Sequence, residues 1–129
     1  MIKGDVGMAQ RRMFSLQVID TDKFMDLPLS ARLLYYELGM RADDDGFIAS
    51  VKRVSRSVGC NPSDIELLLE KGYLLEFDSG VMAIRHWKLN NYIQGDRYHH
   101  TIYKKEFDQL YCENGIYDFD EIIDLGFGN

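Results

Sequence analysis

Residues 50–90 read SVKRVSRSVGCNPSDIELLLEKGYLLEFDSGVMAIRHWKLN, and this stretch decides the fold. Its first part has apolar residues at helical spacing on one face and three cations on the other. Gly59 follows directly, where a helix end favours a left-handed residue. We therefore expect a helix over about 51–58. Its two faces consist of Val51, Val54 and Val58, and of Lys52, Arg53 and Arg56.

The next part of the stretch carries the start signals of a second helix. Asn61 can cap the helix, Pro62 suits its first position, and Asp64 places a favourable charge in the first turn. These signals predict a helix over about 62–71. Its expected buried stripe consists of Ile65, Leu68, Leu69 and Tyr73.

Two short apolar runs follow, Leu74–Phe77 and Val81–Ile84, and they are joined by Asp78-Ser79-Gly80. A three-residue connection that ends in Gly is typical of a β-hairpin, which we expect to span about 74–87. A helix, a short turn, a helix and a hairpin together indicate a winged helix-turn-helix. The sequence thus predicts an α+β, mostly α, fold: a winged helix-turn-helix with an N-terminal extension and an extra C-terminal helix.

The rest of the chain is expected to surround this unit. We expect residues 1–10 to be a poorly ordered extension, residues 11–111 to form the winged-helix domain, and residues 112–129 to be an acidic and apolar tail packed on the domain or on a partner. Alternating Phe14, Leu16 and Val18 suggest an extended segment. An almost entirely apolar helix should cover Ala31–Ala42, and the run Asp43–Gly46 should end it before a short strand at 47–49 that pairs with the hairpin.

The charge distribution, the cysteines and the length of the apolar runs indicate the kind of protein. The 129 residues carry a net charge of −6, but the stretch from Asp108 to Asn129 has six acids and no Lys or Arg, which leaves 15 acids against 15 bases before it. The acidity therefore lies in the tail. The two cysteines have no paired spacing and no apolar run is long enough to span a membrane, so we expect a cytoplasmic protein.

The pattern does not indicate an enzyme, a cofactor or a metal. No phosphate-binding glycine loop, nucleophile elbow or zinc spacing is present. The run Asp43-Asp44-Asp45-Gly46 lacks the distant Glu that closes a calcium loop. We interpret it as a turn that ends a helix.

Basic residues predict contact with DNA, mainly through phosphates. Against base reading, the second helix is expected to expose Asp64, Glu66 and Glu70, and acids are repelled by phosphates. We therefore expect weak DNA binding with little sequence preference. The candidate DNA-binding residues are Lys52, Arg53, Arg56, Arg85, Lys88, Arg97, Lys104 and Lys105.

Apolar residues beyond the needs of a small domain predict self-association as a dimer or larger assembly. They come from the apolar helix, from a last helix expected after Thr101, on which four of them share a face, and from the tail after Cys112. The alternative is that the last helix and the tail fold back over the apolar helix and complete a monomeric core. The candidates are Tyr36, Met40, Tyr103, Phe107, Leu110 and Tyr111.

Several motifs resemble the N-terminal domain of phage replisome organisers, which are DnaD-like replication initiation proteins of phages and prophages of Gram-positive bacteria. The motifs are GMRADDDGF at Gly39–Phe47, His86-Trp87, and NYIQGDRY at Asn91–Tyr98 with Thr101 and Tyr103 after it; residues Arg11–Gly39 fit the opening of the same domain.

The resemblance implies a winged-helix module that helps to start DNA replication by binding DNA, by self-assembly or by contacting helicase-loading proteins. In that family a second domain commonly follows, and the functions of that domain are not carried over to this chain. Two alternatives stay open: an assembly module of the replisome without direct DNA binding, and, with less support, a prophage transcription regulator.

Overall fold

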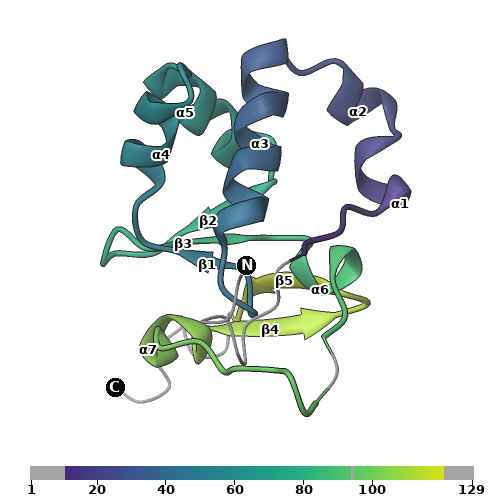
Figure 1. The fold of residues 1–129 in the computed structure, drawn as a ribbon, viewed down its shortest axis with the longest axis vertical. Coiled ribbons are helices and arrows are strands. Elements are labelled where there is room, and N and C mark those ends of the chain that lie inside the picture. The colour runs from purple at the N-terminus through teal and green to yellow at the C-terminus, as the bar shows by residue number, and fades with distance from the viewer. Residues whose placement is uncertain (1–10, 94, 121–129) are drawn as a thin grey trace, which may run out of the picture.

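The computed structural model describes residues 11–93 and 95–120. The expected extension 1–10 and the end of the expected tail, 121–129, lie outside the described residues. The described part is an α+β domain of seven helices and two small antiparallel sheets, arranged as helices above a central sheet and a hairpin below it (Figure 1).

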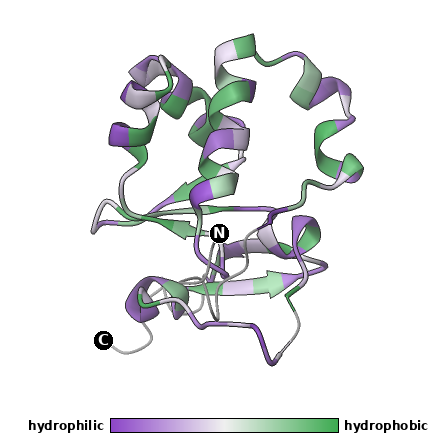
Figure 2. Cartoon of the chain, in the orientation of Figure 1, coloured by the Kyte–Doolittle hydropathy of each residue, from purple (hydrophilic) through white to green (hydrophobic). Residues whose placement is uncertain are grey.

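Five helices form the upper layer, with α3 between the pair α4 and α5 and the short helices α1 and α2 (Figure 1). Figure 2 shows apolar and hydrophilic segments alternating along these helices, as expected of elements that bury one face. The bounds are Leu16–Ile19 for α1, Asp22–Met25 for α2, Leu29–Arg41 for α3, Val51–Ser57 for α4 and Pro62–Glu70 for α5.

The central sheet has the strand order β1-β3-β2, and both pairings are antiparallel. Phe47 lies opposite Ala83, and Leu75 lies opposite the same Ala83 from the other side. The strand that follows α3 is thereby joined to the hairpin that follows α5. The strands are β1 (Phe47–Ile48), β2 (Leu74–Glu76) and β3 (Met82–Ile84).

Buried apolar residues form two cores. The larger one lies mainly among the helices, where Phe24, Leu34, Leu38 and Leu68 are fully buried, and it extends to Trp87 and Tyr117 below the sheet. The smaller one contains Phe47, Phe77, Val81 and Ala83, and residues from the lower layer cover it. The lower layer consists of α6 (Trp87–Asn90), α7 (Lys104–Phe107), β4 (Leu110–Glu113) and β5 (Ile116–Phe119).

The predicted helix pair and the predicted hairpin are confirmed to within a residue or two, except that the hairpin ends at Ile84 and Trp87 already begins α6. Asp64 acts at the start of α5 as expected, because its Oδ2 accepts a hydrogen bond of 2.9 Å from the main-chain N–H of Asn61. The expected pairing of the strand after α3 with the hairpin is also confirmed.

The expected extended segment at 14–18 is wrong, because α1 begins at Leu16. Ser15 caps this helix: its Oγ accepts a hydrogen bond of 3.1 Å from the main-chain N–H of Gln17. The main-chain N–H of Ser15 in turn donates to Oδ1 of Asn90, at 2.8 Å. A cap and a distant partner thus outweigh the alternating pattern.

The expected extra C-terminal helix is wrong beyond Phe107. The helix α7 has a single turn, and Leu110 and Tyr111 belong to β4, which pairs with β5. Asn114 and Gly115 form the turn, with φ angles of 56° and 83°. This left-handed pair is the strongest short signal of a two-residue hairpin, and it overrides the helical spacing of the aromatic residues.

None of the helices within the described ranges has the length and apolar character needed to cross a membrane.

Candidate nucleic-acid interface

The exposed face of α4 carries the three cations Lys52, Arg53 and Arg56. Val51 and Val54 on the opposite face are buried, and they hold the helix so that the cations face solvent. Within residues 11–93 and 95–120, no ion pair or hydrogen bond joins these three side chains to the rest of the chain. They are therefore available to phosphate groups.

A pocket of about 300 Å³ lies beside this face, between α4, α5 and the β2–β3 hairpin. Lys52 and Arg56 line it together with two acids, Glu66 and Glu76. Its apolar walls come from Ile65, Leu69, Pro62 and Met82. The pocket places cations and carboxylates next to one another at the junction of the helix pair and the hairpin.

The outer face of α5 is acidic, but less so than expected. Glu66 and Glu70 are exposed, whereas Asp64 is buried, so the expectation that Asp64 faces solvent is wrong. Oδ1 of Asp64 accepts a hydrogen bond of 2.8 Å from the hydroxyl of Ser30 in α3. Asp64 thus joins two helices, and α5 presents two acids to any ligand.

The tip of the β2–β3 hairpin is tied to the lower layer. The hydroxyl of Ser79 donates a hydrogen bond of 2.6 Å to Oε2 of Glu106 in α7. Asp78 beside it is exposed. The tip therefore offers acidic groups and no cation, which makes it a poor phosphate contact.

Arg85 and Lys88, two of the candidate residues, hold acids of their own chain. Arg85 forms an ion pair of 3.0 Å with Asp118 and donates from Nε to the main-chain carbonyl of Tyr117, at 3.2 Å. Lys88 forms an ion pair of 2.9 Å with Asp45 and lies over the ring of Tyr98. Both cations stabilise the lower layer.

The remaining candidates Arg97, Lys104 and Lys105 are exposed, but they lie in the lower layer, on the other side of the central sheet from α4 (Figure 1). The eight candidates therefore do not form one surface. Only the α4 group combines exposure, proximity in the chain and a position beside the helix pair.

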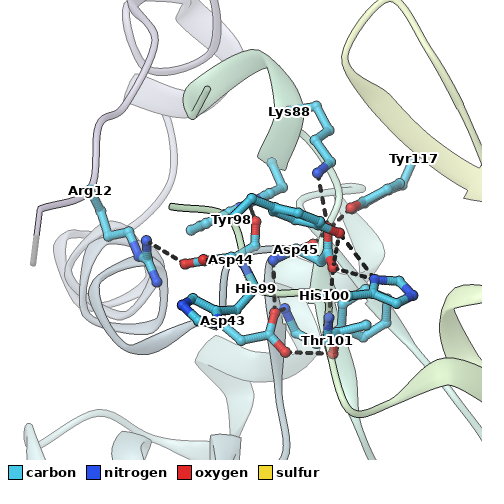
Figure 3. A network of polar contacts seen from close by, with 12 residues as sticks. Arg12, Asp43, Asp44, Asp45, Lys88, Tyr98, His99, His100, Thr101 and Tyr117 are labelled. Atoms are coloured by element: carbon cyan, nitrogen blue, oxygen red, sulfur yellow. Dashed lines mark hydrogen bonds and ion pairs between the residues drawn. The ribbon is translucent and has the colours of Figure 1, made fainter. Parts of the chain in front are cut away.

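A network around Asp43, Asp44 and Asp45 is the main feature that the sequence did not reveal (Figure 3). The side chain of Asp45 is fully buried and accepts hydrogen bonds from the hydroxyl of Tyr98 at 2.7 Å and from the main-chain N–H of Thr101 at 2.8 Å. Nδ1 of His100 lies 3.1 Å from the same carboxylate. One acid therefore fixes the loop 95–101.

The neighbouring acids extend the network. Oδ2 of Asp43 accepts a hydrogen bond of 2.5 Å from the hydroxyl of Thr101, and Asp44 accepts one of 2.9 Å from the main-chain N–H of His99. Asp44 also forms a buried ion pair of 3.2 Å with Arg12. The guanidinium of Arg12 lies over the ring of Trp87, whose Nε1 donates to the main-chain carbonyl of Asp44.

Burial by itself raises the pKa of Asp45, but hydrogen bonds from Tyr98, Lys88 and Thr101 outweigh it and hold the pKa below its usual value. Burial and the nearby acids raise the pKa of Tyr98 and Tyr117 above that of a free phenol. Asp45 therefore stays ionised and both tyrosines stay neutral donors at pH 7.

Asp43, Asp44 and Asp45 hold the turn after α3 against the loop 95–101 and Arg12. The three acids find their partners within the chain, and no group of three His, Cys, Asp or Glu side chains in the described ranges could hold a metal ion. Cys60 is a buried free thiol whose pKa is raised by burial, and Cys112 is an exposed free thiol.

The six residues predicted for self-association lie in two places. Tyr103, Phe107 and Leu110 are half-buried against the smaller core, and Tyr111 on β4 is exposed. Tyr36 packs edge-on against Phe14, and Met40 in α3 is exposed. Tyr103, Phe107 and Leu110 thus cover this chain's own sheet, and Met40 on α3 and Tyr111 on β4 are the two exposed candidates.

Comparison with models of protein families, with curated proteins and with solved structures found no match to the chain.

Proposed function

We propose that the chain is a winged helix-turn-helix module of DNA-replication initiation, similar to phage replisome organisers, which binds DNA mainly through its backbone and self-associates. In this proposal α4 and α5 are the helix pair and the β2–β3 hairpin is the wing. The proposed place of action is the cytoplasm of a bacterial host. Helicase-loading proteins are further proposed partners.

The exposed row Lys52, Arg53 and Arg56 is the observation that carries the DNA-binding part. Three neighbouring cations on one helix can neutralise successive phosphates, and release of counterions then favours binding. Among the described residues, none forms an ion pair with these three cations, whereas Arg85 and Lys88 are each paired with an acid. The α4 face is therefore the proposed contact.

The surroundings of this row favour low sequence preference. Glu66 and Glu70 on α5 and Asp78 at the hairpin tip are exposed. Carboxylates at these positions repel phosphates and leave few donors for base edges. A contact through α4 alone positions the domain on a backbone without reading the bases.

The same acids favour the alternative of a replisome assembly module that contacts protein and not DNA. A prophage transcription regulator is a weaker alternative, because regulators need base reading, which an acidic α5 does not favour.

DNA titration monitored by fluorescence anisotropy tests the proposal, with single- and double-stranded DNA of unrelated sequences at two salt concentrations. We expect weak binding that decreases steeply with salt and is lost in the triple variant Lys52→Glu, Arg53→Glu, Arg56→Glu. Equal binding by this variant and the unchanged chain would rule out the α4 contact.

A matched control carries the same change of net charge in the lower layer: Arg97→Glu, Lys104→Glu, Lys105→Glu. Loss of binding in the α4 variant alone supports the proposed surface. Equal loss in both variants would mean that only net charge matters, and no binding by the unchanged chain would favour the assembly module.

A further inference from the structure

Helix α3 has a second apolar stripe on the face opposite its buried one. Leu29, Leu33 and Met40 are 76%, 42% and 49% exposed, and Tyr36 between them is half-buried. The buried face consists instead of Ala31, Leu34, Tyr35, Leu38 and Gly39. The helix is therefore apolar on two sides. The domain core buries one of them, and on the other only part of Tyr36 packs against the chain, on Phe14 and Phe24.

The spacing of the exposed stripe is that of a coiled-coil seam. Steps of four, three and four residues separate Leu29, Leu33, Tyr36 and Met40. A heptad repeat places such residues at alternating d and a positions, here d, a, d and a. The seam covers most of the 13-residue helix.

Charges of opposite sign flank the seam. In this heptad register Arg32 occupies a g position and Glu37 the e position five residues later. Two parallel helices bring each g residue next to the e residue of the following heptad on the partner. An antiparallel pair would instead bring g next to g and e next to e, which places like charges together.

We propose that α3 is the dimer interface: two copies of this chain pair their α3 helices in parallel about a two-fold axis along the helices, with Leu29, Leu33, Tyr36 and Met40 in the seam. Nε of Arg32 donates to the main-chain carbonyl of Leu27 at 3.2 Å, and in the dimer the guanidinium also forms an ion pair with Glu37 of the other copy. This inference rests on the self-association part of the proposed function, and it names the surface and the orientation.

The helix that pairs with the α3 seam belongs to a second copy of this chain, because the charges of Arg32 and Glu37 complement each other across a two-fold axis. A single type of chain supplies both Arg32 and Glu37, so that one two-fold operation satisfies both bridges. Glu37 is paired with Arg41 of its own helix at 2.5 Å, and its side chain remains 32% exposed. Its two oxygens can serve Arg41 and the partner's cation together.

Sedimentation equilibrium from low to high micromolar concentration tests the dimer. We expect the apparent mass to rise from 15.0 kDa toward twice that value. The variant Leu33→Glu should stay at 15.0 kDa, with circular dichroism showing an intact fold. A mass of 15.0 kDa for the unchanged chain at every concentration, or an undiminished dimer in Leu33→Glu, overturns the proposal.

Charge variants test the bridges. Arg32→Glu alone and Glu37→Arg alone each place like charges at both bridges and should weaken dimerisation about tenfold. The double variant Arg32→Glu, Glu37→Arg should recover most of it. Arg53→Gln is the control, because it removes a cation from the exposed face of α4, away from Glu37, and should leave dimerisation unchanged. Single variants that dimerise as strongly as the unchanged chain overturn the pairing.

Cysteine cross-linking tests the orientation. In a Cys112→Ser background, Leu29→Cys should form a disulfide-linked dimer on mild oxidation, because position 29 meets its own copy only in a parallel pair. Arg53→Cys on α4 is the control and should not cross-link. Cross-linking of Leu29→Cys only with Met40→Cys in a mixture would indicate the antiparallel pair and overturn the proposal.

DNA titration of the monomeric Leu33→Glu variant separates this inference from the proposed DNA contact. We expect binding of a short duplex to persist, since α4 is unchanged. Dimerisation without DNA binding would refute the DNA-binding part of the proposed function alone, and DNA binding by a chain that stays monomeric would refute the α3 interface alone.

Discussion

The hydroxyl of Tyr117 in β5 donates a hydrogen bond of 2.8 Å to the main-chain carbonyl of Asp45, which lies 72 residues earlier in the turn after α3. Both groups are buried. The main-chain N–H of Tyr117 also donates to the carbonyl of Arg85, at 2.8 Å. One residue thus joins the β4–β5 hairpin to the acidic turn and to the chain that leaves β3.

The variant Tyr117→Phe should lower the free energy of unfolding by about 1–3 kcal/mol, because it leaves a buried carbonyl without its donor. Urea denaturation measures this change. Tyr111→Phe is the matched control on the neighbouring strand, where the side chain is exposed, and it should have almost no effect. An equal effect of both variants would show that the hydrogen bond to Asp45 contributes nothing.

Asp45→Asn should loosen the loop 95–101. The amide replaces a charge that accepts hydrogen bonds from Tyr98 and Thr101 and pairs with Lys88, and breaking a buried pair of this kind costs about 2–4 kcal/mol. Hydrogen exchange of the Thr101 amide should become faster. Asp26→Asn at the exposed end of α2 is the control, and unchanged exchange at Thr101 in Asp45→Asn would contradict the prediction.

Gly46 and Gly80 provide a matched pair for the close packing of Trp87. Both have a left-handed backbone, with φ angles of 89° and 90°. A Cβ at Gly46 would lie 2.6 Å from Cγ of Trp87, whereas a Cβ at Gly80 would meet nothing within 4 Å. Gly80→Ala should therefore cost about 1–2 kcal/mol from the backbone alone.

Gly46→Ala should cost the same strain plus about 1–3 kcal/mol of overpacking. Thermal unfolding of the two variants gives the comparison directly. Similar losses in both would mean that Trp87 can move aside, and the buried contact of Arg12 with the Trp87 ring would then be less rigid than the structure indicates.

Much of the upper layer could be predicted from the sequence because its signals are local. Asn61-Pro62 starts α5, Gly59 follows α4, and Gly80 closes the hairpin, and each acts within a few residues. The lower layer was predicted less well. Asn114-Gly115 is also a local signal, and weighing it above the helical spacing of the aromatic residues would have predicted β4 and β5.

The candidate site also has a part that local sequence signals predict and a part that they do not. The exposure of the α4 cations follows from helical periodicity, so it could be predicted. The pairing of Arg85 with Asp118 and of Lys88 with Asp45 depends on segments 33 and 43 residues apart, which periodicity does not relate. The sequence predicts that the acidic run is a turn, which the structure confirms, but the contacts that make it the centre of a network join it to residues more than 50 positions later.

His86 should make the protein less stable as the pH falls from 7 to 5. Burial, with smaller effects of Arg85 and Lys23, lowers the pKa of His86 from 6.5 to about 4. Between these two pH values the unfolded chain binds a proton that the folded chain does not. The contribution of His86 to the free energy of unfolding is therefore fully present above pH 6.5 and is lost as the pH falls toward 4.

Urea denaturation at pH 7 and pH 5 measures this effect. His86→Phe keeps a ring beside Tyr73 but cannot titrate, so it should lose less stability than the unchanged chain between the two pH values. An equal loss in both proteins would show that other groups cause the pH dependence.

Arg53 and Arg85 should differ in what their removal costs. Arg53 is exposed on α4, so Arg53→Gln should weaken DNA binding and reduce the slope of log affinity against log salt by about 0.9, the value of one phosphate contact. Arg85 holds Asp118 and the carbonyl of Tyr117, so Arg85→Gln should leave that slope unchanged and lower the free energy of unfolding by about 1 kcal/mol.

Anisotropy titrations over a salt series and urea denaturation of the same two variants give both quantities. Each variant removes one guanidinium and one unit of positive charge. A nonspecific effect of net charge would therefore reduce the slope of log affinity against log salt equally in both variants. A reduced slope in Arg85→Gln would place Arg85 at the DNA despite its ion pair. An unchanged slope in Arg53→Gln would remove α4 from the contact.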